Sequence, residues 1–204
     1  FDTQQMTVSG RWFLHYASAL NDFTQMPAVI GLLSLLFLGL AAALAVDLLA
    51  IRSTILAGLA GAVMAAFPSM GYTFLYMFTA SAYCLAILLA VLSVWLARRG
   101  RLGWMGGVVL LALSMGTYQA YVTLAIALSL LVLFRETLDP AASFRGTFRS
   151  GVSLAAYLAA GAVLYYAILL VFLKVKDLEL LSYLGMDAAS SGYPFASLPS
   201  LILR

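Results

Sequence analysis

The stretch at residues 27–49, PAVIGLLSLLFLGLAAALAVDLL, decides the fold because it is long and apolar enough to cross a membrane as one helix. A helix of this length rises about 34 Å, and the hydrocarbon core of a bilayer is about 30 Å thick. Pro27 marks its start, because proline is well tolerated in the first turn of a helix. Asp47, near the end of the segment and close to Arg52, is expected at the interface, where it is hydrated or paired.

The composition of the whole chain indicates a membrane protein with several spanning helices. Of the 204 residues, 64% are hydrophobic and only 9% are charged. A soluble domain with so little charge would expose apolar surface and aggregate. The net charge of +3 does not indicate nucleic-acid binding, and the single cysteine, Cys84, excludes an internal disulfide and a cysteine cluster for a metal.

Five further apolar segments follow the first, so we predict an all-α, polytopic bundle of six spanning helices. The predicted ranges are residues 53–67, 71–97, 102–115, 120–134 and 151–173. The second segment is short enough to stop beneath a cavity. Its small residues Gly58, Ala62 and Ala66 have the spacing that lets a neighbouring helix backbone approach closely. Gly103 and Gly107 in the fourth segment have the same kind of spacing, GxxxG.

A row of polar side chains marks the third segment. Tyr72, Tyr76, Thr79 and Tyr83 share one face at helical spacing. Their hydroxyls need partners, so we expect this face to point into the bundle or a wet cleft. The alternative is an aromatic belt at the membrane surface, which suits Tyr72 and Tyr76 but not the deeper Tyr83.

The arginines predict the orientation of the chain. They lie in three connections: Arg52; Arg98, Arg99 and Arg101; and Arg135, Arg145 and Arg149. These connections alternate with uncharged ones at residues 67–71 and 116–119, so the basic set is expected in the cytoplasm. Both ends of the chain then lie outside, although Lys174 and Lys176 in the last segment fit this orientation less well.

Residues 1–26 form the long polar stretch before the spanning segments. From Gly10 on, two stripes recur at helical spacing: a polar one of Arg11, His15, Ser18 and Asp22, and an aromatic one of Trp12, Tyr16, Ala19 and Phe23. A helix with such faces lies flat in a membrane interface, and Ser9 or Gly10 would cap its start.

The chain therefore divides into three predicted parts. Residues 1–26 are an extracytoplasmic loop with an interfacial helix, residues 27–173 are the transmembrane bundle, and residues 174–204 are an extracytoplasmic loop leading to a further segment. The chain starts without Met and ends in an apolar run, so we expect it to be a fragment of a longer protein.

The polar residues of the outer face suit transfer of a group from a lipid phosphate. Asp2 can act as a general base, a role that contributes typically about 10²- to 10⁴-fold, and Arg11 can clamp a phosphate. Each has an ordinary alternative, because a loop aspartate is often only solvated and an arginine can reach lipid headgroups. His15 also fits an exposed position on an interfacial helix. The sequence lacks a catalytic triad, a glycine-rich phosphate loop and metal-ligand spacing, so we expect no metal and no cofactor.

At Gly10-Arg11-Trp12, after an outer-loop aspartate and before the proline that opens a spanning helix, the chain resembles the serotype-converting O-antigen glucosyltransferases of the Gtr type. The break at residues 67–68 and the stretches Tyr-Thr-Phe at residues 72–74 and Thr-Tyr-Gln-Ala at residues 117–120 also fit that family. The resemblance covers about residues 1–135.

The resemblance implies a GT-C-like, multi-pass protein of the bacterial inner membrane. Such an enzyme takes a hexose, glucose, from a polyprenyl-phosphate carrier on the outer face and passes it to a lipid-linked O-antigen acceptor. It implies Asp2 as the base, although the paired acids usual in the family are here only Asp2 followed by Thr3. The predicted substrate-binding residues are Arg11, Trp12, His15, Tyr72, Tyr118 and Gln119. The expected partners are the donor, the acceptor and membrane lipids, without nucleic acid.

Two other classes of protein stay open. A flippase for lipid-linked sugars or a small-solute transporter would show an ionisable residue or a broken helix near the middle of the membrane, often in inverted repeats. Neither a repeat nor a charge at that depth is visible in the sequence. An O-antigen polymerase or ligase is the other alternative, because it would use the same donors.

Overall fold

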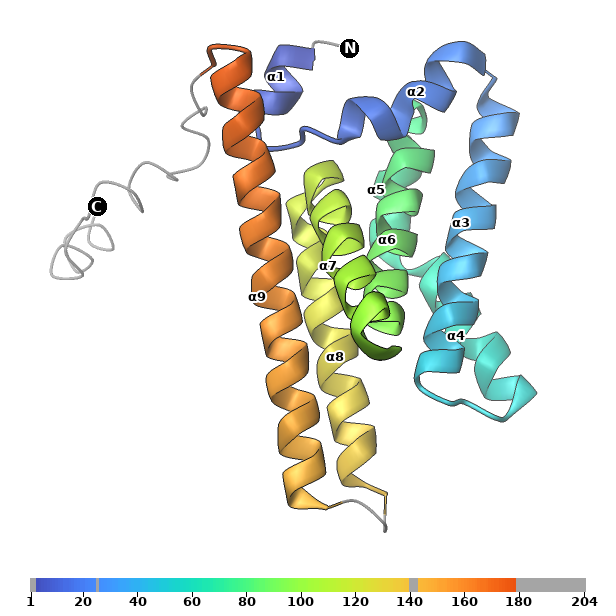
Figure 1. Cartoon of the computed structure of the whole chain (residues 1–204). Helices are drawn as coiled ribbons and strands as arrows, with labels where there is room; N and C mark the ends of the chain where they lie inside the picture. Colours follow the sequence, from blue (N-terminus) through green and yellow to red (C-terminus); the bar gives the residue numbers. More distant parts are fainter. Residues whose placement is uncertain (1–2, 25, 140–142, 179–204) are drawn as a thin grey trace, which may run out of the picture.

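The computed structural model describes residues 3–24, 26–139 and 143–178, and every regular element in these ranges is a helix (Figure 1). The helices are α1 Thr3–Val8, α2 Leu14–Thr24, α3 Pro27–Leu48, α4 Thr54–Ala66, α5 Pro68–Leu75, α6 Met77–Ala97, α7 Gly100–Thr117, η1 Gln119–Tyr121, α8 Val122–Thr137 and α9 Phe144–Val175. Within the described residues, four stretches are long and apolar enough to span a membrane: α3, α6, η1 with α8, and α9. The prediction of an all-α, polytopic bundle is confirmed.

Helix α6 lies at the centre of the bundle. It packs along α3 on one side and α7 on the other, and α7 packs in turn against α9 (Figure 1). Ala82, Ala86 and Ala90 form a small-residue stripe at every fourth position of α6, and all three are fully buried. Small side chains let helix backbones approach closely in a membrane, which explains how α6 accommodates several neighbours.

Glycines place α7 directly against α6. A Cβ at Gly107 would lie 2.6 Å from the Ser93 carbonyl oxygen, and a Cβ at Gly103 would overlap the backbone of α6 in the same way. The GxxxG spacing therefore marks a close helix contact, as predicted. The corresponding prediction for Gly58, Ala62 and Ala66 is wrong: a Cβ at Gly58 would meet nothing within 4 Å among the described residues, and both alanines are exposed.

The second and third predicted segments are divided differently in the structure. Helix α4 ends at Ala66, and Pro68 starts a separate helix, α5, because proline can open a helix but disrupts its interior. Tyr76, with φ −100° and ψ 66°, then separates α5 from α6, so the single helix predicted at residues 71–97 is wrong. Tyr72 and Tyr76 consequently do not continue the face of Tyr83, and they are 74% and 56% exposed.

The polar stretch at the start of the chain forms α1 and α2 instead of one helix from Gly10 (Figure 1). Gly10 has φ 80° and turns the chain, and α2 starts only at Leu14. The predicted stripes are also wrong, since Ser18 is fully buried and Tyr16 is 56% exposed. The reason is tertiary packing: α2 lies across the end of α6, and the Asn21 side chain donates to the Phe78 carbonyl at 2.7 Å.

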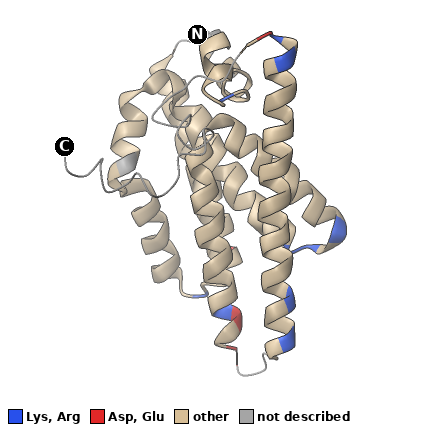
Figure 2. Cartoon of the chain, turned by 90° about the vertical axis from the view of Figure 1, so that its left-hand side faces the viewer, with Lys and Arg blue, Asp and Glu red and all other residues tan. Residues whose placement is uncertain are grey.

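The bundle has two chemically different ends (Figure 2). The arginine-rich end comprises residues 47–53, 95–101, 134–139 and 143–149, and the capped end comprises residues 3–24, 116–121 and 172–178. The arginine-rich end carries the seven arginines that predicted the orientation, and the capped end carries Arg11, Lys174 and Lys176. Of the two uncharged connections, the one at residues 116–119 lies at the end opposite to these seven arginines.

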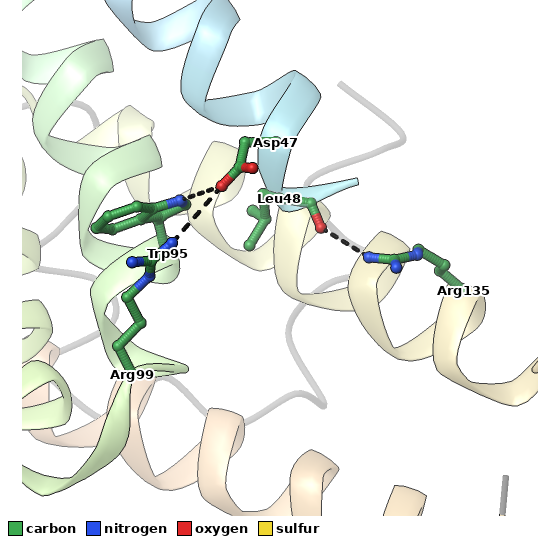
Figure 3. A network of polar contacts seen from close by, with 5 residues as sticks. All are labelled: Asp47, Leu48, Trp95, Arg99 and Arg135. Carbon is green, nitrogen blue, oxygen red and sulfur yellow. Dashed lines mark hydrogen bonds and ion pairs between the residues drawn. The ribbon is translucent and has the colours of Figure 1, made fainter. Parts of the chain in front are cut away.

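Polar contacts join three helices at the arginine-rich end (Figure 3). The Trp95 indole N–H donates to Asp47 Oδ2 at 2.7 Å, and Arg99 Nη2 lies 3.8 Å from the same oxygen. Arg135 Nη1 donates to the Leu48 carbonyl at 3.2 Å. Asp47 is therefore paired at the end of its helix, and its partner is Arg99 instead of the nearby Arg52.

Candidate functional site

The link between α1 and α2, residues 9–13, is held by side chains from distant parts of the chain. Gln119 Nε2 donates to the Ser9 carbonyl at 2.9 Å, and the Tyr165 hydroxyl donates to the Gly10 carbonyl at 3.0 Å. Gln119 Nε2 also lies 3.1 Å from the Tyr165 hydroxyl. The Phe13 backbone N–H donates to the Gly116 carbonyl at 2.8 Å. The conformation of the link is thus determined by α7, η1 and α9.

Gly10 is required in this link for two reasons. Its φ of 80° lies in the left-handed region, which other residues adopt only at a cost. A Cβ at this position would also lie 2.7 Å from the Tyr165 hydroxyl and would overlap the Gln119 side-chain amide. Any side chain here would break the hydrogen bonds that fix the link.

Arg11 lies over an aromatic cluster that closes the capped end. Its guanidinium carbon is 5.0 Å from the centre of the Tyr118 ring, which is the geometry of a cation–π contact. The Tyr118 ring in turn lies 5.5 Å from the rings of both Tyr83 and Tyr121. Tyr83 therefore points into the bundle, as predicted. Thr73 on α5 hydrogen-bonds Tyr121 and brings α5 to the same end.

Trp12 anchors the link in the core. It is only 5% exposed, and its ring stacks on Phe172 with centroids 5.6 Å apart and planes 16° from parallel. The indole also packs against Gly116, where the absence of a side chain leaves room for it. Trp12 thus fixes the position of Arg11, its neighbour in the chain.

Three buried nitrogen atoms of this region have no hydrogen-bond partner among the described residues: Arg11 Nε, Trp12 Nε1 and His15 Nδ1. A buried polar group without a partner costs roughly 1–3 kcal/mol. The arginine and tryptophan nitrogens are donors only, and a histidine nitrogen is a donor in one of its neutral forms and in its charged form. Three such nitrogens within five residues of sequence have the donor chemistry that an acceptor-rich ligand such as a phosphate requires.

The structure brings together five of the predicted site residues. Arg11, Trp12 and His15 lie on or next to the link, and Tyr118 and Gln119 contact it from the start of η1. The sixth, Tyr72, is on α5, and no contact joins it to these five within the described part of the chain.

The catalytic prediction for Asp2 falls on a residue outside the described ranges, and its role stays a prediction. The predicted outer segment at residues 174–204 is likewise described only as far as residue 178.

Sequence reasoning missed the contribution of α9. Besides Tyr165 and Phe172, Lys176 reaches the N-terminal region, where its Nζ donates to Thr7 Oγ1 at 3.2 Å. A signal for Tyr165 was present in the sequence: it lies on a stripe with Tyr157, Gly161 and Leu169 at every fourth position, and all four are buried. The adjacent Tyr166 is off this stripe and is 53% exposed.

Comparison with known proteins gives one family. The family model described as glucosyl transferase GtrII matches residues 1–201, which is nearly the whole chain. No curated protein and no solved structure matches the chain.

Proposed function

This chain belongs to the glucosyl transferase GtrII family, and from that premise we propose that it transfers glucose from a polyprenyl-phosphate carrier to an O-antigen or similar cell-surface glycan. Family membership makes it a glucosyl transferase with a sugar donor and an acceptor, and its apolar helices make it a membrane protein. Membership of this family also favours glucose transfer over the alternative functions of solute transporter, lipid-linked sugar flippase, O-antigen polymerase and O-antigen ligase. Our proposal adds three points to family membership: the lipid carrier of the sugar, the identity of the acceptor, and the location of the reaction on the outer face of the bacterial inner membrane.

The observation that supports the carrier is the set of three unpaired nitrogens on the link and the first turn of α2. A polyprenyl-phosphate sugar places an anionic phosphate at the membrane surface and its chain in the hydrocarbon. Arg11 Nε, Trp12 Nε1 and His15 Nδ1 together offer the hydrogen-bonding capacity that phosphate oxygens require. Arg11 and Trp12 precede the N-terminus of α2 and His15 lies in its first turn, where the helix dipole favours an anion.

The depth of the link suits this substrate. Trp12 stacks on Phe172, close to the end of α9, so the link lies where the longest spanning helix reaches the membrane surface. A carrier chain in the bilayer would place its phosphate at this level. Arg11, held over Tyr118, is the residue that we assign to the donor phosphate.

The proposed reaction is a direct displacement. The acceptor hydroxyl oxygen attacks the anomeric carbon of glucose, and the bond from that carbon to the phosphate oxygen breaks. Polyprenyl phosphate leaves with the bonding electrons, and Arg11 stabilises its charge. Asp2 accepts the proton of the acceptor hydroxyl.

The proposed orientation follows from the two ends of the bundle. The arginine-rich end carries seven arginines in three connections and is assigned to the cytoplasm (Figure 2). The link and its aromatic cluster then lie on the outer face, where a lipid-linked glycan acceptor is assembled into surface polysaccharide.

The test compares two arginines at opposite ends of the bundle. Arg11→Ala removes the proposed phosphate contact, whereas Arg52→Ala removes an exposed arginine at the arginine-rich end. A hydrogen bond to a charged group contributes about 1.5–3 kcal/mol, so transfer by Arg11→Ala should fall roughly 10- to 150-fold. The measurement is transfer of labelled glucose from polyprenyl-phosphate glucose in membrane vesicles. Equal activity of Arg11→Ala and Arg52→Ala would overturn the assignment.

A further inference from the structure

A second feature with binding chemistry lies at the other end of the molecule, between α8 and α9. It is a groove of about 610 Å³, lined on the α8 side by Leu133 and Thr137 and on the α9 side by residues that include Phe144, Phe148 and Ala155. Its lining side chains are apolar or carry only a hydroxyl group. The groove has no part in the proposed transfer reaction, because the link lies at the capped end.

Helix α9 is too long to lie wholly within the hydrocarbon. Its 32 residues rise about 48 Å, whereas the hydrocarbon core is about 30 Å thick. Its C-terminal part is held at the capped end by the stacking of Phe172 on Trp12. The surplus therefore falls at the other end, and the first turns of α9 lie at the level of the lipid headgroups.

The charges on these first turns conflict with the rules for a helix in water. Helix N-termini favour acidic residues, yet the first turn of α9 has none and contains Arg145. Arg149 follows one turn later, and like charges at this spacing repel. Within the described residues, neither arginine forms an ion pair, and both are exposed. Unpaired arginines at a helix N-terminus are expected where a bound group outside the chain supplies the missing negative charge.

The aromatic residues beside these arginines are also placed unfavourably for a helix in water. The rings of Phe144 and Phe148 stack with centroids 6.2 Å apart, and the two residues are 88% and 64% exposed. Both rings line the groove. Large apolar rings with adjacent arginines are unfavourable in water and favourable at the surface of an anionic membrane.

We propose that the groove between α8 and α9 binds one anionic phospholipid, with an acyl chain against Phe148 and Ala155 and the phosphate on Arg145 and Arg149. The phosphate offsets the repulsion between the arginines and supplies the anion that the N-terminus of α9 lacks. The acyl chain covers the apolar lining from Phe148 to Ala155, which leads from the headgroup level toward the hydrocarbon. The occupant is a lipid because a free phosphate would leave the groove and the stacked rings uncovered.

The test uses the full chain in detergent with phosphatidylglycerol as the probe and phosphatidylcholine of the same acyl chains as the reference. Native mass spectrometry gives the number of lipid molecules bound per chain as a function of lipid concentration. Arg145→Gln/Arg149→Gln removes the proposed headgroup contacts next to the groove-lining Phe144 and Phe148. Arg52→Gln/Arg101→Gln removes two exposed arginines of the same end that lie outside α8 and α9, the two helices that form the groove. We expect the first pair to weaken phosphatidylglycerol binding about 30-fold and the second pair to leave the groove-bound lipid in place.

A third variant tests the contact with the acyl chain separately from the contacts with the headgroup. Ala155→Phe narrows the groove and keeps every arginine, so it should also displace phosphatidylglycerol. Soluble glycerol phosphate should not compete with the lipid. The proposal is overturned if phosphatidylcholine binds the native chain equally well, if Arg145→Gln/Arg149→Gln binds normally, if Ala155→Phe has no effect, or if glycerol phosphate competes.

Discussion

Gly116→Ala is the substitution that most directly tests how the link is held. A Cβ at this position would lie 2.7 Å from both Cε2 and Cζ2 of the Trp12 indole and 3.1 Å from Phe13 Cβ. The indole is 5% exposed and stacked on Phe172, so it has no free space to move into. The substitution must therefore displace Trp12 or separate the link from α7.

The magnitude follows from two opposing terms. Alanine is favoured over glycine in a helix interior by up to about 1 kcal/mol, and Gly116 lies in α7. Overpacking a buried site typically costs about 1–3 kcal/mol. Gly106→Ala in the same helix is the matched control, because its Cβ would lie 3.6 Å from Leu96 Cδ1, an ordinary contact. Gly116→Ala should thus be less stable than Gly106→Ala by about 1–3 kcal/mol.

The assay is unfolding of the two purified variants in the same detergent, combined with the glucose-transfer measurement. Gly106→Ala should keep both stability and transfer. Gly116→Ala should lose transfer as well as stability, because Arg11 follows Trp12 away from the Tyr118 ring. If Gly116→Ala were as stable and as active as Gly106→Ala, the packing of Trp12 against α7 and its role in positioning Arg11 would both be refuted.

Three further predictions concern single contacts. Gly10→Ala should be less stable than Gly100→Ala, since both glycines have positive φ but only Gly10 has neighbours within 4 Å; the difference, measured by unfolding, reports the lost hydrogen bonds and should be about 1–3 kcal/mol. A double-mutant cycle of Gln119→Leu and Tyr165→Phe should give a coupling energy of about 0.5–1.5 kcal/mol, and additive effects would contradict the shared network. Asp47→Asn should change the unfolding free energy by less than about 1 kcal/mol, because its ion pair is exposed; a larger loss would show a role that the structure does not explain.

The parts of the fold that were predictable are those that depend on local composition. Spanning segments follow from uninterrupted apolar length, and the contact of α6 with α7 follows from Gly103 and Gly107. The same small-residue argument failed for Gly58, because spacing shows where a backbone can approach and not whether a partner is present. The division at Tyr76 carries no proline or glycine, so nothing in the local sequence indicated it.

The candidate site was predictable as a list of residues but not as a geometry. The sequence indicated Arg11, Trp12 and Gln119, yet it placed the first two on a helix that begins only at Leu14. The extended link depends on hydrogen bonds between residues more than a hundred positions apart, such as that of Tyr165 with the Gly10 carbonyl. Periodicity along one segment contains no information about such contacts.

The hydrogen bond from Tyr165 to the Gly10 carbonyl has a consequence for biogenesis, because it joins residues separated by 155 positions. The segment with Arg11 leaves the ribosome early, but the helix that holds its backbone is synthesised and inserted much later. The link can therefore reach its observed conformation only after α9 has been synthesised. A nascent chain arrested before that point would carry Arg11 and Trp12 without the hydrogen bond from Tyr165 to the link and without the stacking of Phe172 on Trp12.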